Sequence, residues 1–259
     1  MAKTNVEKRA AKEARRKQQD ALTYRILIVV VAAFISILVI KMLENMFNTA
    51  ATSWGAYYFF CAVGILGIVL LVLGIVLFIV NVVKKGRIGS APLSCIVAGI
   101  ILAFTGSTIY NMGAHGFGRL LVLYPIVAVL FLVYYIFQKE FFLISLLTAA
   151  CAYLQFSLSR TLGGFSATLA VCILAVICVV IALLCQVIRK KDGMLSTRLE
   201  GIRVFGSKAI YTPVYITCAV VIVVSFVGLL AGSLVAYILM FVMLAYFIAT
   251  AVYYATKML

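Results

Sequence analysis

Long apolar runs, separated by short polar or charged segments, dominate the chain from residue 26 onward. The hydrocarbon core of a bilayer is about 30 Å thick and a helix rises about 1.5 Å per residue, so roughly 20 apolar residues make one span. Because lipid offers no hydrogen-bond partners to the backbone, each run is predicted to be a helix. Six runs have the length of single spans and cover residues 26–47, 56–83, 89–110, 166–188, 213–231 and 233–255.

The apolar segment 120–159 is the difficult case, because it is too long for one span. Its only charged residues are Lys139 and Glu140, which follow Gln138. We therefore predict two spans, about 120–137 and 141–158, with a hinge at Lys139–Glu140. The total is eight.

Proline and glycine positions favour regular helices. Pro92 and Pro213 fall in the first turns of their spans, where the missing N–H is harmless. Pro125 lies only a little deeper, so no proline is expected in the middle of a span. The short Ala231–Gly232–Ser233 connection predicts a tight turn and an antiparallel hairpin between the last two spans.

The distribution of charge supports this count independently. Of 29 charged residues, 22 lie in the segments 1–25, 84–87 and 189–208. With the amino terminus inside, eight spans place 19 of the 22 Lys and Arg residues on the cytoplasmic side, as the positive-inside rule requires. The sequence thus predicts an all-α, polytopic transmembrane helix bundle with both termini cytoplasmic. Its predicted parts are a basic leader (1–25), a single transmembrane domain (26–257) and, within that domain, a cytoplasmic loop (189–211).

Composition changes the picture by excluding a soluble fold. Hydrophobic residues make up 66% of the chain and charged residues 11%, against roughly 45–50% and about 25% in soluble domains. The basic residues of the predicted cytoplasmic segments account for most of the +15 net charge. The basic leader is either a solvated segment that orients the first helix or a segment that binds a lipid bilayer with an anionic inner leaflet, in the plasma membrane. The absence of aromatic or motif signals beside the charge argues against nucleic acid as a partner.

Residue types that carry catalysis or bind metals are scarce in the spans. All seven cysteines fall inside predicted spans, His115 is the only histidine, and no CxxC pair exists. No charged residue lies near the middle of a span, which argues against a proton-coupled carrier and an intramembrane protease. We therefore predict no catalytic residues, no metal and no cofactor, and a protein that is not an enzyme.

Uncharged polar residues remain as candidate contacts for a solute or gate. Thr105, Asn111 and Gln155 could line a path for a neutral solute, although interhelical hydrogen bonding is the simpler interpretation. His115 lies in the glycine-rich segment 111–118, which is either a flexible outer turn or a ligand gate.

The loop 189–211 mixes apolar and basic residues. That composition predicts a segment that lies on the inner leaflet or docks a cytoplasmic or membrane protein partner. The docking candidates are Arg198, Arg203, Phe205 and Lys208.

Two functions of different classes remain open. The first is a transport or permease-type component for a neutral or apolar solute, without an ion-coupling site of its own. The alternative is a non-catalytic membrane subunit or scaffold that assembles with other membrane proteins, for which packing faces and basic docking segments suffice. An intramembrane enzyme acting on lipid is a third interpretation, weakened by the single histidine and the lack of buried acids.

Overall fold

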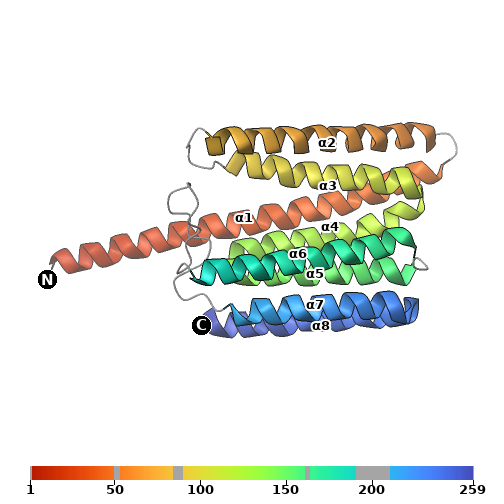
Figure 1. The fold of residues 1–259 in the computed structure, drawn as a ribbon. Coiled ribbons are helices and arrows are strands. Elements are labelled where there is room, and N and C mark those ends of the chain that lie inside the picture. The colour runs from red at the N-terminus through yellow and green to blue at the C-terminus, as the bar shows by residue number, and fades with distance from the viewer. Residues whose placement is uncertain (1, 50–52, 84–89, 161–163, 191–210, 259) are drawn as a thin grey trace. The chain divides into compact units, whose positions relative to one another are not determined.

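The structure is a computed structural model that describes residues 2–49, 53–83, 90–160, 164–190 and 211–258 (Figure 1). All regular structure in these residues is helical, and each of the eight helices is long and apolar enough to cross a membrane. The prediction of an all-helical chain with eight such helices is confirmed. The helices are α1 (Ala2–Asn48), α2 (Ser53–Val83), α3 (Ser90–Met112), α4 (His115–Ile136), α5 (Lys139–Arg160), α6 (Phe165–Lys190), α7 (Thr212–Ala231) and α8 (Ser233–Met258).

Helix α1 continues without a break from the basic leader into the first apolar run (Figure 1). Its 47 residues exceed the needs of one span, and the apolar part, Ile26–Asn48, is long enough alone. The leader is rich in Ala, Lys, Arg, Gln and Glu, which are all strong helix formers, so the helix extends to Ala2.

The segment 120–159 contains two helices, as predicted. Helix α4 ends at Ile136 and α5 begins at Lys139, so the break falls one to two residues before the predicted hinge at Lys139–Glu140. Both charged residues belong to the first turn of α5. A carboxylate there interacts favourably with the positive end of the helix dipole, which explains why Glu140 starts a helix.

Pro125 lies near the middle of α4, and the prediction that no proline occupies the middle of a span is wrong at this position. The error arose at the start of the helix. The chain turns within Gly113–Ala114, where Gly113 has a φ of 55°, and α4 then begins at His115 rather than near residue 120. Because proline has no N–H, α4 lacks the hydrogen bond that the carbonyl of Leu121 would otherwise accept.

The chain divides into two compact units. Unit 1 comprises Met1–Ser36, Pro125–Val179 and Thr212–Leu259, and unit 2 comprises Ile37–Tyr124 and Val180–Tyr211. The predicted organisation into a leader and a single transmembrane domain stays a prediction.

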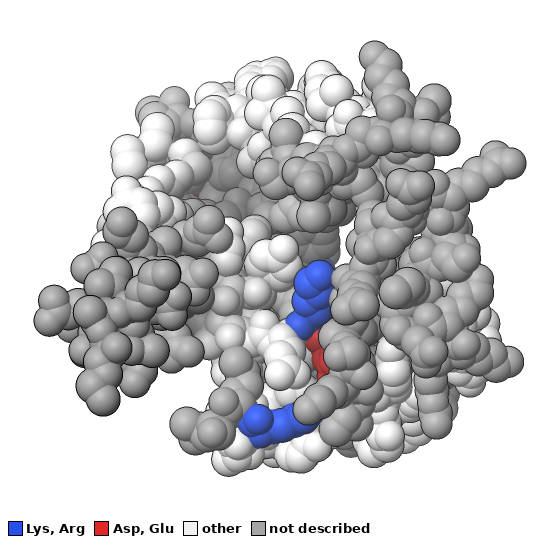
Figure 2. Space-filling model, turned by 90° about the vertical axis from the view of Figure 1, so that its left-hand side faces the viewer, with Lys and Arg blue, Asp and Glu red and all other residues white. Residues whose placement is uncertain are grey.

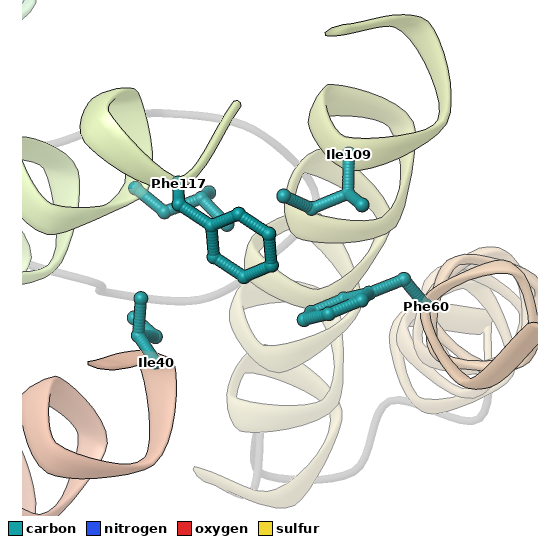
Figure 3. Packing of buried hydrophobic residues seen from close by; sticks show 5 residues of the cluster. Ile40, Phe60, Ile109 and Phe117 are labelled. Carbon is teal, nitrogen blue, oxygen red and sulfur yellow. The ribbon is translucent and has the colours of Figure 1, made fainter. Parts of the chain in front are cut away.

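In unit 2, α2 and α3 form an antiparallel pair held together by close contact at glycines (Figure 1). Gly64 lies against Gly106, and Gly67 lies against Ala103. Beside this pair, a cluster of buried apolar side chains joins α1, α2, α3 and α4 (Figure 3). The ring of Phe117 contacts that of Phe60 edge to face, with 5.4 Å between their centroids. The buried members of the cluster are Ile40, Phe60, Ile109, Phe117 and Leu120.

In unit 1, α5 is the central helix. In the most apolar stretch of α5, 56% of the residues are buried, whereas the share is 33% or less in every other described span. This burial arises because α5 packs against both α7 and α8. Helices α7 and α8 form the predicted antiparallel hairpin, with Gly232 at a φ of 91° between them. This conformation is strained for any residue with a Cβ, so glycine allows the turn to be this short.

Candidate functional site

Thr105 is buried in unit 2, and its hydroxyl hydrogen is used within the protein. Its Oγ1 donates to the carbonyl of Ile101 at 2.7 Å and lies 3.2 Å from the hydroxyl oxygen of Tyr124. A threonine hydroxyl has one hydrogen, so Tyr124 must be the donor in the second bond. Thr105 therefore joins α3 to α4 and has no hydrogen to offer a solute.

Asn111 and His115 lie at exposed positions where α3 gives way to α4. The Asn111 amide donates to the carbonyl of Ser107 at 2.8 Å and lies 3.2 Å from the Ser107 hydroxyl. Six residues separate Thr105 from Asn111, so their side chains point about 120° apart around the helix. The two residues do not converge on one site.

The glycine-rich segment 111–118 has only two residues, Gly113 and Ala114, outside the helices. Gly116 lies within α4, and a Cβ there would come within 2.9 Å of the carbonyl oxygen of Thr108. This glycine therefore has a packing role, since it lets α4 approach α3 closely. The alternative role of His115 in a gate stays a prediction.

Gln155 is fully buried in unit 1 and joins α5 to α7. Its Nε2 donates to the carbonyl of Val224 at 2.9 Å, while its Oε1 accepts no hydrogen bond. The amide lies directly against Gly228, where any Cβ would overlap it. One turn away, Cys151 Sγ and Ser225 Oγ are 3.6 Å apart across the same interface. These contacts make Gln155 a packing residue between two helices.

The predicted inner docking residues Arg198, Arg203, Phe205 and Lys208 lie outside the described residues.

Charged side chains in the described spans lie at helix ends. Lys41 and Glu44 form an ion pair of 2.7 Å near the end of α1. Arg160 ends α5, with its guanidinium 4.8 Å from the centre of the Phe156 ring. Figure 2 shows the face that lies on the left-hand side of Figure 1, where blue Lys or Arg and red Asp or Glu atoms of the described residues lie among white ones. Apolar middles with charged ends are the pattern that a bilayer imposes on a spanning helix.

Unit 1 contains a partly open cavity between α4, α5 and α8, with a volume of about 220 Å³. Small side chains on α5 and the mid-helix proline of α4 leave this space. Its wall includes Pro125 and Val129 of α4, Ala149 and Ala152 of α5, and Met243 and Phe247 of α8.

The two hydroxyls in the cavity wall are directed to the backbone of their own helix. Ser145 donates to the carbonyl of Phe141 at 2.7 Å, and Thr148 donates to those of Ile144 and Ser145, both at 3.0 Å. The wall therefore offers no hydroxyl hydrogen to a bound group and is effectively apolar.

The size and lining of the cavity favour an apolar occupant. An apolar protein cavity of about 150 Å³ stays dry and can hold benzene. Water would find few partners there, so a hydrocarbon group is the favourable filling.

Sequence reasoning missed this cavity. Two signals could have indicated it: the small-residue run Ala149–Ala150–Cys151–Ala152 on α5 and the proline in the middle of α4. Each is common in membrane helices, and only the fold brings the two together.

Among the described residues, no group of three or more His, Cys, Asp or Glu side chains could hold a metal ion. The chain matches no protein-family model, no curated protein and no solved structure. The eight apolar helices are compatible with a multi-pass membrane protein, and they suggest an integral membrane location.

Proposed function

We propose that this protein is a multi-pass transport component of the plasma membrane that accommodates an apolar solute within its helices. In this proposal it is not an enzyme and carries no ion-coupling site of its own. The observation that carries the proposal is the apolar cavity between α4, α5 and α8.

The chemistry of the described polar groups favours an apolar solute over a polar neutral one. Thr105, Ser145 and Thr148 each donate their hydroxyl hydrogen to a backbone carbonyl of their own helix. Gln155 donates to Val224 and is sealed against Gly228. A solute that needs hydrogen-bond donors would have to break these bonds, whereas an apolar one needs only the cavity.

The proposed partners are the anionic inner leaflet and a docking protein. The basic leader would contact anionic headgroups of the inner leaflet, since each basic residue near such a surface contributes about 1 kcal/mol. The loop 189–211, with Arg198 and Lys208, would dock a protein that supplies energy if transport is driven.

The test is protein-dependent transfer of a slowly exchanging fluorescent alkyl probe from proteoliposomes to acceptor vesicles. Ala149→Leu should slow transfer several-fold, because the added atoms fill the cavity. Ala150→Leu is the matched control: Ala150 is exposed on the same helix and does not line the cavity. Equal transfer by both variants and the wild type would argue against the proposal.

The alternative, a non-catalytic subunit, makes the opposite prediction. At native expression the protein would co-purify with other membrane proteins in fixed stoichiometry, and filling the cavity would leave assembly unchanged.

A further inference from the structure

We infer that the cavity of unit 1 binds one hydrocarbon chain of a bilayer lipid, which enters between α4 and α8 from the lipid side. The inference deepens the proposed function by naming the substrate class, and it rests on that function in taking these helices as membrane-embedded. Three features of the cavity support it.

The first feature is that the cavity leads from an exposed rim to less exposed side chains. Val129 of α4 and Leu244 of α8 both line the cavity, and each is 43% exposed. Leu130 of α4 and Phe247 of α8 line it as well, and both are half-buried. A chain that enters at the rim can therefore contact these less exposed side chains.

The second feature is size. A volume of about 220 Å³ is below the roughly 300–1,000 Å³ of pockets that enclose drug-sized ligands. A whole lipid cannot fit, whereas part of one flexible chain can, with its headgroup left at the membrane surface. The hydroxyls of Ser145 and Thr148 offer the chain no hydrogen, which suits an unsubstituted alkyl segment.

The third point is the abundance of acyl chains around the rim of the cavity. A site occupied by mass action fills with the ligand that is most abundant around it. For a cavity whose rim faces hydrocarbon, that ligand is the acyl chain, and any free apolar solute must displace it.

The test uses a phosphatidylcholine with a photoactivatable diazirine in one acyl chain, mixed into phosphatidylcholine vesicles that contain the full-length protein. After illumination, labelled residues are mapped by peptide mass spectrometry. We expect labelling at Leu130 and Phe247, the half-buried residues of the cavity wall.

Two pairs of variants make the result specific. Ala149→Leu, which fills the cavity, should reduce labelling of Phe247 several-fold, whereas Ala150→Leu should not. Leu244→Trp, which narrows the rim at an exposed position, should also reduce it, whereas Phe241→Trp on the exposed face of α8 should not. The rim pair keeps the test decisive if Ala149→Leu fails to fold, as judged by thermal unfolding in detergent.

Unlabelled Leu130 and Phe247 in the wild type, or labelling that neither filling nor narrowing reduces, would overturn the inference. Labelling that free decane displaces would be expected for a site specific to alkyl chains. Because labelling is measured at equilibrium, it can succeed where transfer fails. A bound chain without transfer would contradict the proposed function and leave the site intact.

Discussion

Individual hydroxyl groups join neighbouring helices in both units by the same arrangement. In unit 2, Thr105 donates to its own helix and accepts from Tyr124 of α4. In unit 1, Thr217 donates to the carbonyl of Pro213 at 2.8 Å and, because that uses its only hydrogen, accepts from Tyr246 of α8, also at 2.8 Å. In lipid such bonds contribute on average only about 0.6 kcal/mol, so they set the alignment of helices more than they determine total stability.

Variants of Gln155 and Gly228 can test whether the buried Gln155 amide stabilises the packing of α5 against α7. Gly228→Ala should destabilise the protein, because the new Cβ pushes the Gln155 amide away from the Val224 carbonyl. In a Gln155→Ala background the same change should cost much less, since the amide is gone. Unfolding of the four proteins in mixed detergent micelles should give a coupling energy of about 0.5–3 kcal/mol, the range for residues in contact. Strictly additive effects would show that the two residues do not compete for space.

At the scale of helices, the α2–α3 pair depends on backbone contact, and its register is regular. Gly64 lies against Gly106, Gly67 against Ala103, and Gly99 against Leu71. Helices in lipid associate without a hydrophobic driving force, so close backbone packing at small residues is their main source of attraction.

Gly106→Ala should therefore destabilise unit 2, because its Cβ would overlap the backbone of Gly64, which cannot move aside. We expect a loss of about 1–3 kcal/mol, as for other overpacked sites. The matched control is Gly55→Ala in α2, where nothing lies within 4 Å of the new atom. The control should be neutral or slightly stabilising, because alanine is the better helix former. Equal thermal stabilities of the two variants would contradict this account.

The presence of each helix could be predicted from the sequence, because apolar length alone decides whether a segment can span a bilayer. The residues at which helices begin and end were harder to predict. The turn at Gly113–Ala114 is so short that His115 already belongs to α4, and this shift moves Pro125 to mid-helix. The role of Gln155 was also ambiguous, since a polar residue in an apolar run is compatible with binding a solute or another helix. Its partner, Val224, is 69 residues away in the sequence, and nothing local indicates that contact.

At the scale of the whole chain, eight spans and the charge asymmetry predict which segments face the cytoplasm. Single cysteines introduced at Ala2 and Gly201 of a cysteine-free variant should react with a membrane-impermeant maleimide only from the cytoplasmic side. A cysteine at Gly113, between α3 and α4, should react only from outside. The reason is that 19 of 22 basic residues then lie inside. Labelling of Gly201 from outside would refute an even number of spans before that loop.

The pH dependence of transport depends on which groups within the spans can change charge. The eight spans contain one histidine, His115, and two carboxylates, Glu44 and Glu140, none of them near the middle of a helix. Glu44 is paired with Lys41, and Glu140, although only 5% exposed, stands in the first turn of α5. A carrier coupled to protons normally needs such a group along its path, where the solute passes.

We therefore expect the transfer rate to change less than about twofold between about pH 6 and 7.5 at fixed membrane potential. His115 is the only histidine of the chain, so His115→Gln tests whether any dependence comes from a histidine. The measurement is a transfer titration on the wild type, His115→Gln and Glu140→Gln. A steep dependence that persists in His115→Gln would contradict the uncoupled mechanism. Its loss in Glu140→Gln would then assign proton coupling to the start of α5, where the sequence suggested only a hinge.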